Sequence, residues 1–236
     1  MTLADLSTVG IAFLLRDVSA GFKVREKADS VLYLRATMLK DELARAFLTT
    51  QSFKWDKTTG FKLASGVISP FYVDCRLLMA HPAPRNIVAQ LAVKAIKDLP
   101  FDCIGGLEIG AIAIVTAISD YGYSQAPRRE WRTFVVRKQP KDHGLGKLIE
   151  GAVKPGDRAL IVDDVLTTGG SIVKAVQAAR EAGLQVDHAL VIVDRNEQEG
   201  RARVERLGIT LLSLLTIKDL MDLQEQRRRR AERYTD

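Results

Sequence analysis

From about residue 101 onward, short apolar runs alternate with longer stretches in which apolar residues recur every three or four positions. Short runs are typical of buried strands, and the longer stretches are typical of helices that pack on a sheet. This alternation predicts βαβ units and therefore an α/β fold, with a parallel sheet flanked by helices. The expected strands are residues 101–104, 133–136, 159–162, 189–193 and 209–212.

Two of the helical stretches, 111–119 and 171–182, give the clearest pattern. The second is followed by Gly183, and a glycine directly after a helix readily adopts the left-handed conformation that ends it. Residues 84–99 have the same helical spacing and should pack on the sheet. We expect a further short amphipathic helix at residues 39–47.

Ahead of the parallel part lie two short β-rich segments, 61–63 and 71–74, with Ser65, Gly66 and Ser69 between them. Small turn residues between two extended segments favour a hairpin-like pair. We expect this pair to form a small N-terminal hood outside the parallel sheet, over a site. The expected parts are an N-terminal extension at 1–37, a core domain with the hood at 38–223, and a basic C-terminal tail at 224–236.

A chain of 236 residues with 47% apolar content can bury one substantial core. The net charge of +6 comes in part from the arginines at 227–230, and a positive field suits nucleic acid and small phosphorylated anions equally. Cys75 and Cys103 have no CxxC spacing, which argues against a disulfide framework or a zinc site and favours a reducing cytoplasm. No run reaches the roughly 20 apolar residues of a membrane span, so we expect no membrane partner.

The most informative segment is residues 159–171, where an apolar strand runs into two aspartates, a turn of small residues and a helix. Beyond the end of a parallel strand, the following helix offers free N–H groups and its positive dipole end to a phosphate. Thr167, Thr168 and Ser171 add hydroxyl donors, while the glycines at 169 and 170 let the backbone approach an anion. The segment predicts a phosphate site that is neither a P-loop nor a dinucleotide motif.

Two carboxylates beside a phosphate site need a partner of their own, and Asp163 and Asp164 suit the vicinal hydroxyls of a ribose. Taken singly, the aspartates are only a strand end and the turn only a helix cap. Together they resemble the phosphoribosyl pyrophosphate (PRPP) motif of type I phosphoribosyltransferases. The resemblance implies that PRPP is bound by Asp163, Asp164, Val165, Leu166, Thr167, Thr168, Gly169, Gly170 and Ser171.

A long polar loop follows the strand at 133–136 and begins Arg-Lys-x-x-Lys-Asp-His-Gly. Its cations suit closure over a departing pyrophosphate. This segment is similar to the catalytic loop of the orotate phosphoribosyltransferase family. The similarity implies that Lys141 is the main catalytic cation, assisted by Arg137 and His143, and that Lys138 binds PRPP.

The hood and one strand end are similar to the same family. The resemblance implies that Tyr72 and Val73 flank the pyrimidine, that Thr167 contributes to its site, and that Arg195 pairs with the carboxylate of orotate. A planar guanidinium binds a carboxylate in bidentate fashion, so this role is chemically sound. The alternative for Arg195 is a salt bridge with Asp194 at the strand end.

Two positions depart from the family pattern, because many members carry lysines where this chain has Ala64 and Gly110. Those lysines are therefore not carried over, and Lys62 is a weak substitute for the first. The turn at 105–110 offers backbone N–H groups instead, so Ile109 and Gly110 are counted among the PRPP-binding residues.

The resemblance implies transfer of the 5-phosphoribosyl group from PRPP to orotate, with Mg²⁺ held mainly through PRPP and no metal ligands from the protein. It also implies a homodimer with shared active sites. A purine phosphoribosyltransferase would share residues 163–171 but have no use for Arg195. A PRPP-sensing regulator with its basic tail on nucleic acid could dispense with the loop cations, so their presence favours the enzyme.

Overall fold

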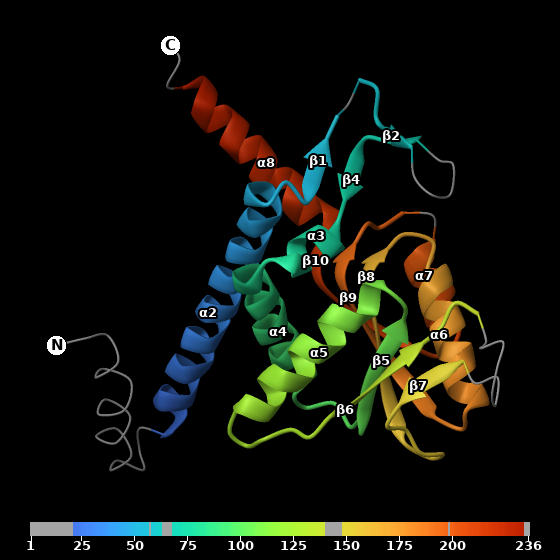
Figure 1. Ribbon diagram of the computed structural model, residues 1–236. Helices are drawn as coiled ribbons and strands as arrows, with labels where there is room; N and C mark the ends of the chain where they lie inside the picture. The colour runs from blue at the N-terminus through green and yellow to red at the C-terminus, as the bar shows by residue number, and fades with distance from the viewer. Residues whose placement is uncertain (1–20, 57, 63–67, 140–147, 198, 234–236) are drawn as a thin grey trace. The chain divides into compact units, whose positions relative to one another are not determined.

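The computed structural model describes residues 21–56, 58–62, 68–139, 148–197 and 199–233 (Figure 1). Of residues 21–33 and 35 it describes the helical backbone alone. The chain divides into two units, Met1–Leu39 and Lys40–Asp236, and the boundary falls inside helix α2 (Gly21–Thr49). The fold and the site described below belong to the second unit.

A six-stranded sheet in the order β10-β9-β8-β5-β6-β7 lies at the centre of this unit. Neighbouring strands are parallel except β7, which runs antiparallel to β6. β8 and β9 are buried along most of their length, as expected for strands that helices cover on both faces. The bounds are β5 Cys103–Leu107, β6 Arg132–Val136, β7 Ile149–Gly151, β8 Arg158–Leu166, β9 Gln185–Asp194 and β10 Thr210–Thr216.

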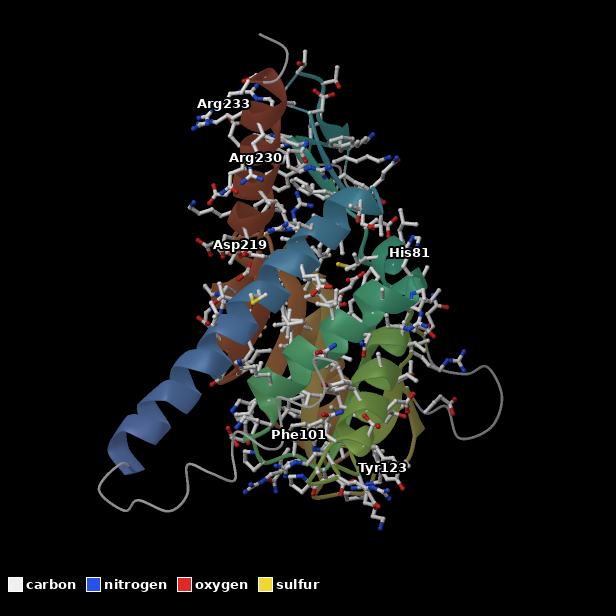
Figure 2. The ribbon with its side chains drawn as sticks, turned by 90° about the vertical axis from the view of Figure 1, so that its left-hand side faces the viewer. His81, Phe101, Tyr123, Asp219, Arg230 and Arg233 are labelled. Carbon is white, nitrogen blue, oxygen red and sulfur yellow. The ribbon has the colours of Figure 1, made fainter. Side chains whose placement is uncertain are left out.

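Helices cover both faces of the sheet. α4 (Pro82–Ile96) and α5 (Gly110–Ser124) lie side by side on one face (Figures 1 and 2), and α6 (Gly170–Glu181) and α7 (Gly200–Glu205) lie on the other (Figure 1). α6 turns a buried stripe of small and branched residues toward the strands. Gly183 follows α6 with φ +82°, which confirms the predicted left-handed helix end.

The predicted strands are present, and most are longer than expected. β9 begins at Gln185, because a polar stretch extends its ladder ahead of the apolar part, and β10 continues through the buried Leu214 and Leu215 to Thr216. The first strand begins at Cys103 rather than at residue 101. Phe101 instead stacks on Trp131, with ring centroids 4.6 Å apart.

The predicted hairpin of 61–63 with 71–74 is wrong. β4 (Phe71–Val73) pairs antiparallel with β1 (Phe53–Trp55), which the sequence pattern did not indicate, while β2 (Phe61–Lys62) pairs with β3 (Ile68–Ser69). Phe53 and Phe71 are buried, so the β1–β4 ribbon is held by apolar side chains from distant positions. Ala64, Ser65 and Gly66 lie outside the described residues.

Two helices extend beyond their predicted limits. The helix expected at 39–47 is the end of α2, which begins at Gly21. The arginines expected in a basic tail continue α8 (Ile217–Glu232), along which Figure 2 labels Arg230. Glu225 lies 3.1 Å from Arg228 and 3.3 Å from Arg229, and such pairs support a helix. No helix in the described part of the chain has the length and apolarity needed to cross a membrane.

Candidate active site

A cavity of about 410 Å³ opens at the edge of the sheet where β5, β8 and β9 end. Ligands of open α/β sheets bind at this edge. Its walls come from β4, the start of α3 (Cys75–Ala80) and the turns after the three strands. The lining residues are Tyr72, Val73, Asp74, Cys75, Arg76, Leu107, Glu108, Ile109, Gly110, Lys138, Asp163, Asp164, Val165, Thr167, Thr168, Gly169, Gly170, Ser171 and Arg195.

The turn between β8 and α6 is shaped by two glycines. Gly169 has φ +73°, and a Cβ added there would lie 2.9 Å from the Gly200 carbonyl oxygen. A Cβ on Gly200 would lie 2.1 Å from the Thr167 carbonyl oxygen, so α7 packs directly on the backbone of the turn. The N-cap residue Gly169 has no side chain, and the only side-chain acceptor at this end among the described residues is Thr168 Oγ1, a long 3.4 Å from the Gly170 N–H, so the N–H groups of this end can serve an anion.

A second helix N-terminus borders the same cavity. α5 begins at Gly110 after Ile109, and it too has no side-chain cap. Glu108, one residue earlier, accepts a hydrogen bond from the Lys138 backbone N–H at 2.9 Å, which ties this turn to the end of β6. Two uncapped helix N-termini in one cavity suit a ligand with phosphate groups at both ends.

The paired aspartates lie at the end of β8 with few donors. Asp163 Oδ1 accepts from the Asp164 N–H at 3.0 Å, and Asp164 Oδ1 accepts from the Val165 N–H at 2.7 Å. Burial and the neighbouring Asp164 carboxylate raise the pKa of Asp163 to about 8. Burial likewise raises the pKa of Asp164. Hydroxyl groups of a bound ribose would supply donors to this pair.

Arg195 is 4% exposed and borders the cavity from the end of β9. Its Nη2 donates to Ser69 Oγ at 2.7 Å, and the guanidinium lies 4.8 Å from the centroid of the Phe71 ring. Its Nε faces Glu197 Oε2 at 3.0 Å, yet neither atom makes a hydrogen bond of good geometry. Nε is therefore directed at the Glu197 carboxylate, while the guanidinium as a whole borders the cavity, where its planar set of donors suits an anionic group of a ligand.

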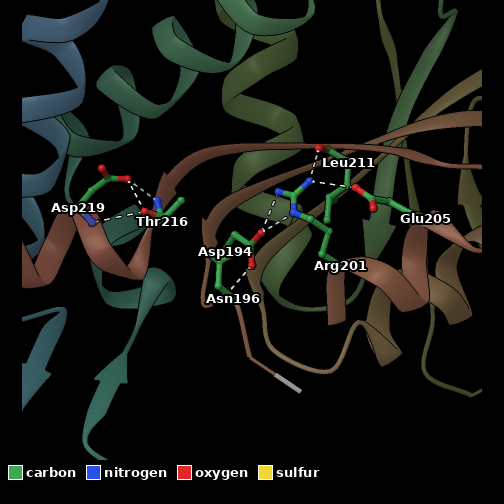
Figure 3. Close-up of polar contacts among 7 residues, drawn as sticks. All are labelled: Asp194, Asn196, Arg201, Glu205, Leu211, Thr216 and Asp219. Carbon is green, nitrogen blue, oxygen red and sulfur yellow. Dashed lines mark hydrogen bonds and ion pairs between the residues drawn. The ribbon is translucent and has the colours of Figure 1, made fainter. Parts of the chain in front are cut away.

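The structure does not contain the alternative salt bridge between Arg195 and Asp194. Asp194 accepts instead from Arg201 Nε at 2.9 Å and from the Asn196 N–H at 2.8 Å (Figure 3). Arg201 Nη1 also donates to the Leu211 carbonyl oxygen at 2.9 Å. This network ties the end of β9 to α7 and β10, and it thereby holds the backbone from which Arg195 projects.

Comparison with known proteins identifies the family. Residues 80–207 match the phosphoribosyl transferase domain. The orotate phosphoribosyltransferase of Aquifex aeolicus is 37% identical over 184 residues, which are 78% of this chain and 99% of that protein. The chain belongs to the orotate phosphoribosyltransferase family.

Other members of the orotate phosphoribosyltransferase family agree with this assignment. The Methanothermobacter thermautotrophicus protein is 42% identical over 159 residues, which are 67% of this chain and 83% of that protein. The Mycobacterium tuberculosis enzyme in complex with PRPP superposes with a TM-score of 0.60 at 30% identity, over 77% of this chain and 91% of that one. Its fold is therefore the fold described here.

Among the residues that the structure describes, most of those expected from the family resemblance border the cavity, and Leu166 and Arg137 do not. Leu166 is buried in the core, although the Arg195 N–H donates to its carbonyl oxygen at 3.1 Å. Arg137 lies 3.8 Å from Glu150 and lines a separate cavity of about 200 Å³ beside α6. Lys141 and His143 lie outside the described residues.

The sequence pattern missed one wall of the cavity, formed by Asp74, Cys75 and Arg76. Asp74 caps α3, because its Oδ1 accepts from the Leu77 N–H at 3.1 Å. The signal was present, since an aspartate ahead of an apolar stretch indicates the start of a helix. Reading Asp74 as the end of a strand concealed it.

We predict that Asp163→Asn raises the melting temperature, and that the gain grows as pH rises from 5 to 8. The pKa of Asp163 is raised from 3.8 to about 8 in the fold, so unfolding releases a proton between these values and the wild type loses stability as pH rises. At pH 8 the gain should be at least about 2–4 °C, the shift that about 1 kcal/mol causes in a chain of this size. Thermal unfolding followed by circular dichroism measures it.

Asp157→Asn is a control of opposite sign. Arg132 lies 2.8 Å from Asp157 and lowers its pKa, so this pair stabilises the fold above the ordinary carboxyl pKa and loses its effect in acid. The control variant should therefore melt below the wild type at pH 8 and approach it at low pH. If the gain in melting temperature for Asp163→Asn is the same at pH 5 and at pH 8, the raised pKa of Asp163 is contradicted.

Proposed function

We propose that this protein transfers the 5-phosphoribosyl group of PRPP to orotate, giving orotidine 5′-monophosphate and pyrophosphate in pyrimidine biosynthesis. The observation that carries this proposal is the buried guanidinium of Arg195, which lines the cavity beside the expected ribose-phosphate site. Relatives that are 37% and 42% identical are orotate phosphoribosyltransferases, and orotate carries the carboxylate that such a guanidinium binds.

The cavity accounts for each part of the donor substrate. The 5-phosphate would bind the N–H groups at the start of α6 with the hydroxyls of Thr167, Thr168 and Ser171, and the ribose hydroxyls would bind Asp163 and Asp164. This places the pyrophosphate toward the turn at Ile109 and Gly110. The bond from C1 of the ribose to pyrophosphate breaks with its electron pair leaving on pyrophosphate, and a ring nitrogen of orotate forms the new bond to C1 and loses its proton to the departing pyrophosphate or to water.

Tyr72 and Val73 line the cavity on the hood side and would flank the pyrimidine ring. The hood is joined to the sheet edge through the hydrogen bond from Arg195 to Ser69, so the base site and the ribose site are held in one arrangement. Such fixed positioning of two reactants lowers the entropic part of the barrier.

We propose Mg²⁺ as the cofactor, held mainly by PRPP oxygens and water. Among the described residues there is no group of three side chains able to form a metal cage, which fits an ion that arrives with its substrate. When bound, the ion would neutralise charge on the pyrophosphate. Asp163 and Asp164 keep the role of ribose acceptors in this scheme.

We also propose a homodimer with shared active sites, acting in the cytoplasm. The family resemblance of the loop that begins at Arg137 suggests the dimer. Arg137 lies beside Glu150 and does not line the candidate active site of its own subunit, which supports donation of this loop to a partner. The buried free thiols of Cys75 and Cys103 fit a reducing compartment.

We predict that orotate is consumed only when PRPP and Mg²⁺ are both present, and that uracil is a far poorer acceptor. Uracil lacks the carboxylate partner of Arg195, and a site built for such a group discriminates strongly against its loss. A spectrophotometric assay of both bases, on the wild type and Arg195→Lys, measures this. Arg195→Lys should lose most of its preference for orotate, because lysine cannot bind the carboxylate in bidentate fashion. Equal turnover of orotate and uracil by the wild type would contradict the role of Arg195 in binding the orotate carboxylate.

We predict that mixing two inactive variants, Lys141→Ala and Asp164→Asn, restores activity. One variant damages the donated loop and the other damages the receiving site, so a mixed dimer has one site with both defects and one with neither. Random pairing makes half of the dimers mixed, and activity should approach about a quarter of the wild type. Co-refolding followed by the orotate assay measures it. No recovery in a sample that contains mixed dimers would show that each loop serves its own subunit.

A further inference from the structure

The cavity must hold a highly charged anion although it is lined by four carboxyl groups, Asp74, Glu108, Asp163 and Asp164. Within the described part of the chain, three cations line it: Arg76, Lys138 and Arg195. Arg195 is buried and is assigned above to the orotate carboxylate. Besides the proposed Mg²⁺, the side-chain charge for the pyrophosphate end must therefore come from Arg76, Lys138 and any groups outside the described residues.

Arg76 is placed for this role by the start of α3. Asp74 caps the helix directly after β4, so Arg76 is the second residue of α3 and projects at the edge where β4 brings Tyr72 and Val73. Its side chain is 66% exposed, and its contact with Asp74 is a long one, Nε to Oδ1 at 3.7 Å. The guanidinium is thus held loosely and can turn toward a ligand.

Arg76 also lies close to the position where the family lysine is missing. Its charge lowers the pKa of Asp164 against the effect of burial, which places it near that carboxyl group. A Cβ added to Gly110 would lie 3.1 Å from Asp164 Cγ, so Gly110 borders the same carboxyl group from α5. Arg76 and Gly110 therefore approach Asp164 from α3 and from α5.

We propose that Arg76 binds the pyrophosphate group of PRPP and contributes positive charge close to position 110, where many members of the family carry a lysine and this chain has Gly110. The space fits this assignment, because a side chain at 110 would press on Asp164, whereas Arg76 lines the same cavity from α3. An arginine also offers a planar fork of donors to phosphate oxygens. This inference rests on the proposed function for the identity of its ligand.

The test measures binding of inorganic pyrophosphate with Mg²⁺ to the full chain by isothermal titration calorimetry, together with the kinetic constants for PRPP and for orotate. Arg76→Ala should weaken pyrophosphate binding and raise KM for PRPP by about tenfold or more, the loss expected when a charged hydrogen bond to an anion is removed. KM for orotate should change little. Arg76→Lys should recover part of the loss, because it restores the charge.

Two further variants separate this role from a structural one. Arg206→Ala is the matched control, since Arg206 is also 66% exposed with a long ion pair, 3.9 Å to Glu199, and lies outside the cavity lining. It should bind pyrophosphate as the wild type does. Asp74→Asn keeps an acceptor for the α3 cap but removes the charge beside Arg76, and it should not weaken pyrophosphate binding.

If the wild type binds pyrophosphate and Arg76→Ala binds it equally well, Arg76 has no contact with the group and the inference is wrong. A loss in Asp74→Asn as large as in Arg76→Ala would show that Arg76 acts only through Asp74, which also overturns it. If the wild type itself binds neither pyrophosphate nor PRPP, the proposed function fails, and the assignment of Arg76 fails with it.

Discussion

The site is organised around a buried carboxyl group, Asp163, and a half-buried one, Asp164, which lie at the end of β8 and must coexist with an anionic substrate. Asp163 and Asp164 lie side by side with raised pKa values, so the free protein holds them at a cost to stability. A phosphate group alone would be repelled by this pair. In the proposed complex, the ribose hydroxyls that link the two ends of PRPP would give the carboxyl groups donors, and the starts of α5 and α6 would face the phosphates. The arrangement therefore favours a phosphorylated ribose over a bare phosphate.

The rest of the fold brings the other groups to that point. Parallel strands end at one edge, so the turns after β5, β8 and β9 meet there without long loops. Gly169 and Gly200 allow α7 to press on the phosphate turn, and Arg201 ties Asp194 to β10, which holds Arg195 in place. The hood is joined to the same edge of the sheet, because Ser69 Oγ accepts a hydrogen bond from Arg195 Nη2 at 2.7 Å.

The β8–α6 segment could be predicted in detail because its strand, turn and helix are consecutive and each is specified by local residues. The hood could not, since the partner of β4 is β1, and that choice depends on the burial of Phe53 against elements distant in sequence. The directions of individual side chains could not be predicted from the sequence either. Leu166 belongs to a contiguous motif, yet its side chain points to the core, while Arg76 has no motif and reaches the cavity because Asp74 starts a helix there.

The most direct test of this account is the response of backbone amide NMR signals to ribose 5-phosphate, a ligand with the phosphate and hydroxyls but no pyrophosphate. The account predicts that the largest changes in chemical shift occur at Gly169, Gly170 and Ser171, with changes at Asp164 and Val165 as the hydroxyls engage the aspartate pair. Changes centred instead on the larger cavity of about 750 Å³ between β1 and α8, with the β8–α6 turn unaffected, would contradict it.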